Sequence, residues 1–133
     1  MKLKEKNKKK SSIFYFKAYL PSILWAIMIF ILSNQERLPS FNISLLDFLF
    51  KKLAHIFVYA ILYYLLFLAY LKTNPSKQVG KKHHLWPLLI ALIYALGDEF
   101  HQSFVKGRYA ATHDIAYDFL GMMSVLLYQQ KML

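Results

Sequence analysis

The chain has 133 residues, of which 57% are hydrophobic and none is cysteine, and it carries a formal net charge of +10. A chain of this length forms one domain, which is too apolar for an ordinary soluble protein, and the lack of cysteine excludes disulfides and thiolate metal sites. The basic residues cluster beside apolar stretches, which indicates contact with anionic lipid headgroups and disfavours nucleic acid as a partner.

The first part of the chain predicts a polar tail followed by a membrane span. Residues 1–12 are lysine-rich, and we expect them to form a solvated cytoplasmic tail before a transmembrane domain over residues 13–133. The first span is predicted from about Phe14 to Ser33, with Pro21 in its first turns, where a missing N–H costs least. Because no clear signal-peptide cleavage site follows the apolar run, we expect this span to be retained.

Residues 34–51 are of mixed polarity and predict a short helix lying in the membrane interface. Its apolar residues recur at helical spacing, and they are Ile43, Leu46, Leu49 and Phe50. The second span is predicted from Leu53 to Leu71, and a polar loop follows over residues 72–82.

The third and fourth spans are predicted near His84 to Gln102 and from about Asp114 to Tyr128. His83 and His84 are expected in a loop at the level of the cytoplasmic headgroups. Both spans are weak, because an aspartate at a helix centre costs about 2.5–3.5 kcal/mol on insertion. We therefore expect them to insert together as a hairpin.

Charge is unevenly distributed between the two ends of the predicted bundle. With the N-terminus in the cytoplasm, twelve of the seventeen lysines and arginines fall on the cytoplasmic side, which follows the positive-inside bias. Six of the seven carboxylates then fall outside. The sequence thus predicts an all-α, multi-pass membrane protein, a bundle of four transmembrane helices with both termini in the cytoplasm.

Polar residues gather at the predicted outer ends of the last three spans, and we expect none to continue across the membrane. Helical spacing places them in three stripes: Lys52, His55 and Tyr59; Asp98, His101 and Gln102; Asp114, Asp118 and Gly121. Burying ionisable groups in a membrane is costly, so the cluster favours a functional pocket. A glycine in the third stripe would let a neighbouring helix approach closely.

A structural interpretation of the same residues remains open. Pairs such as Lys52 with Asp118 and Arg108 with Glu99 could be salt bridges that only fix the packing of the helices. No spacing matches a metal-binding signature, so a metal site is not expected, and no motif identifies a cofactor.

Three sequence blocks resemble those of the VanZ-like membrane proteins. Residues 52–59 read Lys-x-x-His-x-x-x-Tyr, residues 98–108 read Asp-Glu-x-x-Gln-x-Phe-x-x-Gly-Arg, and residues 114–121 read Asp-x-x-x-Asp-x-x-Gly. The blocks follow the family's order over about residues 20–130, and the middle block is the most specific. Lys106 departs from the family, many members of which carry proline there.

The resemblance implies a protein of the bacterial cell membrane. The family takes its name from a member that lowers susceptibility to teicoplanin. For this chain, the resemblance implies an effect on susceptibility to glycopeptide or lipoglycopeptide antibiotics. Such an effect would arise through an outer-leaflet pocket that acts on or binds a cell-envelope lipid, a lipid-linked precursor or the antibiotic itself.

The candidate catalytic residues are His55, Asp98 and Glu99, which can transfer protons. The candidate binding residues are Lys52, Tyr59, Gln102, Arg108, Asp114 and Asp118. Arg108 is included because the planar guanidinium group of arginine can donate two parallel hydrogen bonds to a phosphate or carboxylate. Three alternatives to an enzyme remain open: a non-catalytic binder, a structural protein that acts through a partner, and a transporter, which four spans disfavour.

Overall fold

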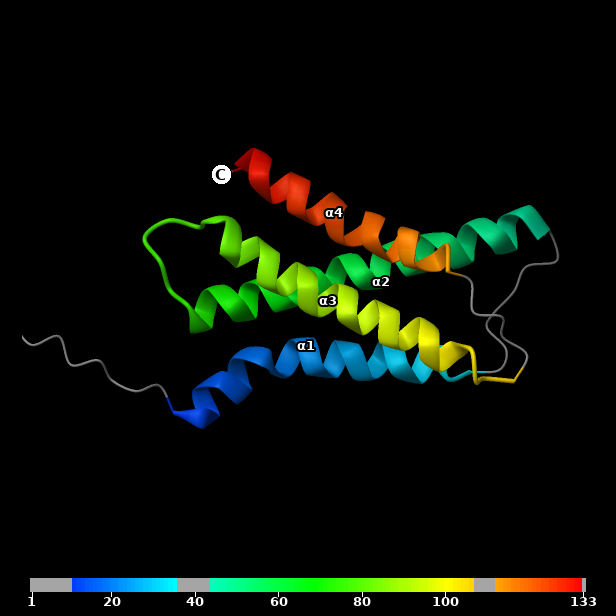
Figure 1. Ribbon diagram of the computed structural model, residues 1–133, viewed down its shortest axis with the longest axis horizontal. Coiled ribbons are helices and arrows are strands. Elements are labelled where there is room, and N and C mark those ends of the chain that lie inside the picture. The colour runs from blue at the N-terminus through cyan, green and yellow to red at the C-terminus, as the bar shows by residue number, and fades with distance from the viewer. Residues whose placement is uncertain (1–10, 36–43, 107–111, 133) are drawn as a thin grey trace, which may run out of the picture.

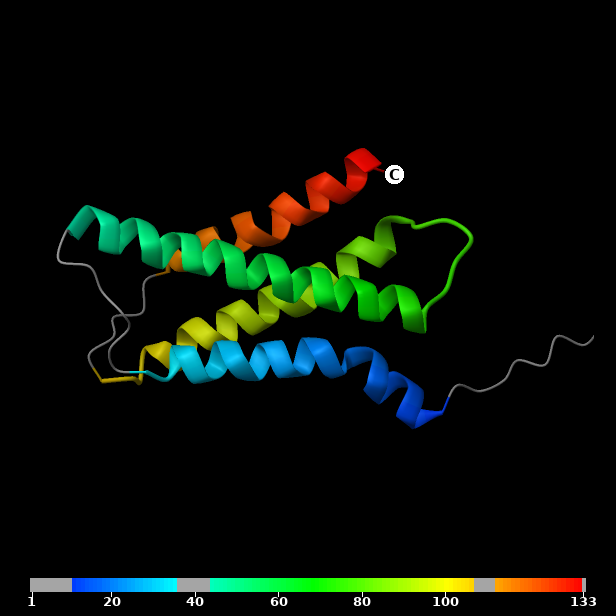
Figure 2. The ribbon, with the colours of Figure 1, turned by 180° about the vertical axis from the view of Figure 1, so that it is seen from behind.

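The computed structural model describes residues 11–35, 44–106 and 112–132, and these form four helices. They are α1 (Ser12–Ser33), α2 (Ser44–Thr73), α3 (Lys81–Gln102) and α4 (Asp114–Met132). Consecutive helices run in opposite directions along one bundle (Figures 1 and 2). We call the end where α2 and α4 begin the aspartate end, and the end that holds the loop between α2 and α3 the lysine end.

The first helix begins at a serine cap and bends in its first third. Ser11 Oγ accepts a hydrogen bond from the Phe14 N–H, which satisfies one of the free donors of the first turn. Pro21 is the tenth residue of α1, so the expectation that it lies in the first turns is wrong. A proline inside a helix removes a backbone hydrogen bond and kinks the helix, and Figure 1 shows such a bend in α1.

The second helix is longer than the sequence predicts. Its 30 residues span about 45 Å, against about 30 Å for the hydrocarbon core of a bilayer. Residues 44–51 are its first turns, so the prediction of a separate interfacial helix is wrong for this stretch, and residues 36–43 lie outside the described part of the chain. No proline or glycine separates the two predicted segments, so one helix continues through both.

The third helix begins three residues before the predicted start, and its first-turn histidines are buried. His83 Nδ1 accepts a hydrogen bond from the Gly80 N–H at 3.0 Å, which caps the start of the helix. The His84 ring stacks on Phe67 of α2, with 4.9 Å between the ring centroids. The prediction that His83 and His84 lie in a loop is therefore wrong, because both belong to the first turn of α3 and are buried.

The second helix lies at the centre of the bundle and contacts the other three. The buried core contains aromatic residues of α2 and small residues of α3, among them Tyr59, Tyr63, Ala91 and Ala95. A Cβ atom added to Gly121 of α4 would lie 2.1 Å from the Ile56 carbonyl oxygen of α2. This distance confirms the predicted close approach of a helix at Gly121.

Two of the helices, α1 and α2, are long and apolar enough to cross a membrane. Only 22% of the most apolar window of α1 and 33% of that of α2 is buried inside the bundle. Core helices of soluble proteins bury most of such a window, so these apolar side chains face outward for another reason. Contact with lipid explains the pattern, which indicates a membrane protein.

Candidate functional site

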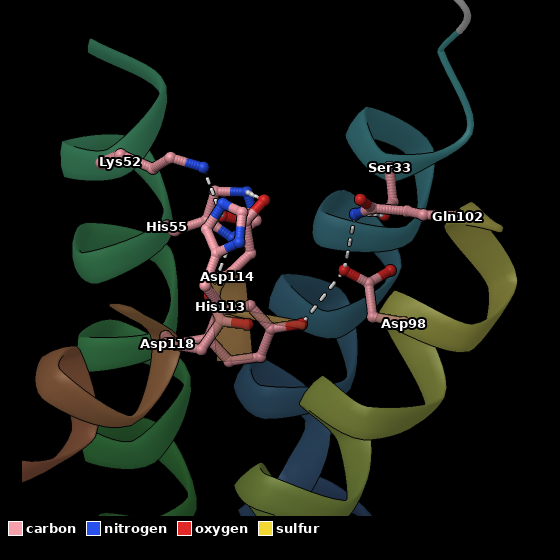
Figure 3. Close-up of polar contacts among 9 residues, drawn as sticks. Ser33, Lys52, His55, Asp98, Gln102, His113, Asp114 and Asp118 are labelled. Atoms are coloured by element: carbon pink, nitrogen blue, oxygen red, sulfur yellow. Dashed lines mark hydrogen bonds and ion pairs between the residues drawn. The ribbon is translucent and has the colours of Figure 1, made fainter. Parts of the chain in front are cut away.

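At the aspartate end, α2 places a lysine and a histidine against two aspartates of α4 (Figure 3). His55 Nδ1 lies 2.8 Å from Asp118 Oδ1, and Lys52 forms an ion pair with Asp114. His55 Nε2 lies 3.9 Å from Asp114 Oδ2, so the two aspartates flank one imidazole ring. The predicted polar stripes of α2 and α4 thus contact each other.

The pairing partners differ from the expected ones. The sequence suggested Lys52 with Asp118, whereas Lys52 contacts Asp114 and Asp118 holds His55. The reason is the register of the two helices, which is fixed by the backbone contact at Gly121. Lys52 therefore contacts Asp114 in the first turn of α4. His55 lies one turn further along α2 and contacts Asp118, which lies one turn further along α4.

The Lys52–Asp114 ion pair is less exposed than the ion pair of the adjacent lysine, Lys51, with Asp47. The side chains of Lys52 and Asp114 are 14% and 13% exposed, and two rings, Phe48 and Tyr117, lie beside the ammonium group. The Lys51–Asp47 pair lies within α2 and is more exposed. An exposed pair of this spacing contributes about 0.3–0.5 kcal/mol, whereas removing one partner of a buried pair costs about 3–5 kcal/mol.

A second polar group lies across the bundle, on α3 and α1. The Tyr59 hydroxyl donates to Asp98 Oδ2 at 3.1 Å, and Gln102 Nε2 donates to the same oxygen at 3.2 Å. Gln102 Nε2 also lies 2.5 Å from Ser33 Oγ at the end of α1. Figure 3 shows Asp98, Gln102 and Ser33 opposite the histidine–aspartate group. Tyr59 belongs to the same α2 stripe as Lys52 and His55, so it joins the two groups.

One oxygen of this network has no partner. Asp98 is 8% exposed, and its Oδ1 atom accepts no hydrogen bond from the described residues, although its Oδ2 accepts two. A buried carboxyl oxygen without a donor costs about 1–3 kcal/mol or more, so such atoms are rare in folded proteins. Asp98 Oδ1 is therefore the atom of the site that most needs a proton or a donor from a bound molecule.

The remaining predicted residues lie at the same end or outside the described chain. Glu99 is 5% exposed and follows Asp98 in α3, and consecutive helical residues point about 100° apart. The two carboxylates therefore leave the helix in different directions. Arg108 lies outside the described residues, so its expected pairing with Glu99 is not described either.

Two contacts of the site were not predicted from the sequence. Ser33 accepts from Gln102, and Asn34 Oδ1 lies 3.2 Å from His101 Nε2. Ser33 and Asn34 could have been noticed in the sequence, because they are polar residues at the end of the first predicted span. His113, considered only as a weak candidate, lies 3.7 Å from Asp114.

Polar contacts also occur near the lysine end, so the expectation that they stop at one side is wrong. Tyr63 lies one turn beyond Tyr59 on α2, and its hydroxyl donates to Gln129 Oε1 of α4 at 3.2 Å. The same hydroxyl lies 3.1 Å from His84 Nδ1 of α3. A tyrosine is apolar along most of its ring, so a polar contact at this depth could not be predicted from the sequence.

The arrangement at the aspartate end suits proton transfer. A histidine whose Nδ1 is held by a buried carboxylate keeps its Nε2 as the acid or base, and Asp118 holds His55 in this way. Across the described residues, no group of three or more histidine, aspartate and glutamate side chains is placed to hold a metal ion. Histidine, tyrosine and carboxylate side chains in this arrangement can carry out acid–base chemistry and can form hydrogen bonds to a ligand.

Comparison with known proteins identifies the family. The sequence model of the VanZ/LLP1 family matches residues 9–129, which include α1, α2, α3 and most of α4. No curated protein and no solved structure gives a significant match. The family resemblance predicted from the three sequence blocks is confirmed by this match, and the chain therefore belongs to the VanZ/LLP1 family.

Proposed function

We propose that all four helices cross the membrane, with both termini in the cytoplasm and the aspartate end toward the outer leaflet. The distribution of lysines supports this topology, because the lysine end and the N-terminal tail hold most of the basic residues. The third and fourth helices carry buried carboxylates, but Asp98, Asp114 and Asp118 each contact a side chain of α2, which lowers the cost of placing them in the bundle.

A C-terminal reporter fusion tests the topology. An alkaline phosphatase fused after Leu133 is expected to be inactive, because it would remain in the cytoplasm, while a fluorescent protein at the same position is expected to fluoresce. As a matched pair, the same two reporters fused after Lys106 should give the opposite result. An active phosphatase at the C-terminus would reverse the proposed orientation of the site.

We infer that the polar site acts on or binds a cell-envelope lipid or lipid-linked precursor, and thereby lowers susceptibility to glycopeptide and lipoglycopeptide antibiotics. The observation that carries this proposal is the buried His55–Asp118 pair, joined through Tyr59 to an aspartate with a free oxygen. A merely structural network would satisfy its own buried atoms. This network leaves an acceptor on Asp98 for a bound molecule.

Each residue has a distinct part in the proposed site. His55 Nε2 is the proposed proton carrier, and Asp118 positions its ring. Tyr59 and Gln102 hold Asp98 through one of its oxygens, so that the other is presented to the ligand. Arg108 is the proposed anchor for a phosphate or carboxylate, because Lys52 is already paired with Asp114.

Susceptibility of a glycopeptide-sensitive bacterial host tests this function. Cells that produce the chain are expected to tolerate more teicoplanin than cells with an empty vector, and His55→Gln is expected to abolish the difference. His101→Gln is the matched control, because His101 lies at the same end but contacts Asn34 of α1. Membrane levels of each variant are measured in parallel. Equal protection by the wild-type chain and His55→Gln, or no protection by the wild-type chain, contradicts the proposal.

A further inference from the structure

A groove of about 420 Å³ opens between α3 and α4 at the lysine end, the opposite end of the bundle from the polar site. Figures 1 and 2 show the first half of α3 and the last half of α4 side by side toward this end. The volume lies within the range of about 300–1,000 Å³ that is usual for small-molecule sites. The groove is lined by Val79, Gly80, Lys81, His84, Leu85, Leu88, Leu126 and Gln130.

The body of the groove is apolar and continuous with the outer surface of the bundle. Leu85 and Leu88 lie one helical turn apart on α3, and Leu126 of α4 faces them across the groove. The neighbouring outward side chains Trp86 and Leu127 are also exposed and apolar. In a membrane, such a surface contacts acyl chains, so the groove opens onto the lipid and one chain can enter it sideways.

The head of the groove is polar and carries positive charge. Lys81 lies in the first turn of α3, where the backbone N–H groups and the helix dipole favour an anion. His84 is 7% exposed, and its Nδ1 is engaged by the Tyr63 hydroxyl. The His84 ring is held by Phe67 and Tyr63, so it forms a fixed polar wall at the head of the groove.

Among the described residues, no aspartate or glutamate lies at this end to oppose an anion. The described aspartates and Glu99 all lie at the aspartate end, whereas Lys72, Lys77, Lys82 and Lys131 lie near the groove's end of the bundle together with Lys81. Basic residues near an anionic membrane surface contribute about 1 kcal/mol each to lipid attraction. Charge and shape thus select the same kind of molecule, one with an anionic head and an apolar chain.

We propose that this groove binds one anionic phospholipid. An acyl chain lies between Leu85, Leu88 and Leu126, and the phosphate lies at the start of α3 against Lys81. Bound in this way, the lipid fills the groove between α3 and α4 and contacts both helices. The proposal does not rest on the chemistry of the aspartate end, so each can fail without the other.

Lipid binding to the purified full-length chain in a neutral detergent tests the proposal, with native mass spectrometry as the readout. One phosphatidylglycerol per chain is expected to be retained, and phosphatidylcholine is expected to bind about fivefold more weakly. Lys81→Glu and Leu88→Trp should each weaken phosphatidylglycerol binding by about fivefold or more, the first through charge and the second by filling the groove. Lys51→Glu is the control, since this exposed lysine lies at the aspartate end, away from the groove.

Circular dichroism checks that each variant is folded, and Leu85→Trp replaces Leu88→Trp if that variant is not, because Leu85 is half exposed. Glycerol phosphate at the concentration of the lipid should not displace it, since the acyl chain supplies part of the binding. Equal binding of the two lipids, unchanged binding by both groove variants, or displacement by glycerol phosphate each overturns the proposal.

Discussion

Replacing Gly121 with alanine is expected to lower the free energy of unfolding of the bundle by about 1–3 kcal/mol or more, the usual cost of overpacking a core. The added Cβ would lie 2.1 Å from the Ile56 carbonyl oxygen, 2.9 Å from its carbon and 3.1 Å from the Ala60 nitrogen. All three are backbone atoms of α2, so no rotamer change can relieve the contact. The two helices must move apart along their main interface.

Gly97→Ala is the matched control for this prediction. Gly97 also lies inside a helix, α3, but a Cβ atom there would have no heavy atom within 4 Å. Alanine is favoured over glycine in a helix by about 0.5–1 kcal/mol, so this variant should be as stable as the wild-type chain or slightly more so. Thermal unfolding of both purified variants in the same detergent measures the difference. An unchanged midpoint for Gly121→Ala would show that α2 and α4 are not in this close contact.

Asp98→Asn is expected to lower turnover of a purified lipid-linked peptidoglycan precursor by about 10²–10⁴-fold, the usual contribution of a general acid or base. The amide has nearly the same shape as the carboxyl group, so Tyr59 and Gln102 can keep the side chain in place. It cannot take up or release a proton. The amide oxygen still accepts from Tyr59 and Gln102, so the amide nitrogen replaces the acceptor that faces the ligand. Binding of the precursor should therefore weaken by the loss of one hydrogen bond, which is less than the loss of turnover.

Asp47→Asn serves as the control for Asp98→Asn. Asp47 is also an aspartate at the aspartate end, but its ion pair is formed with Lys51 within α2. Its replacement should leave both binding and turnover unchanged. If the wild-type chain binds the precursor without turnover, and Asp98→Asn binds it equally well, the protein is a binder and the catalytic role of Asp98 is wrong.

Spacing within one helix was enough to predict which residues share a face. Lys52, His55 and Tyr59 lie on one stripe of α2 because 3.6 residues complete a turn, and this holds whatever the helix packs against. The role of Gly121 followed in the same way, since a missing side chain permits close packing in any bundle.

Contacts between helices could not be predicted to the same detail. Whether Lys52 meets Asp114 or Asp118 depends on a shift of one turn between α2 and α4, and no local pattern encodes that shift. The buried cap at His83 depends on the folded loop that returns to it. Sequence therefore indicated the members of the site, and packing determined their partners.

The length of α2 has a consequence for how the site would meet its ligand. On the proposed topology, counting about twenty residues back from Thr73 places the far limit of the hydrocarbon near Leu53. Lys52 and His55 then lie near the boundary between the hydrocarbon and the aqueous interface, while Tyr59 lies about 9 Å deeper than Leu53, at 1.5 Å per residue. A lipid could thus present its head to the histidine without withdrawing its tails from the bilayer.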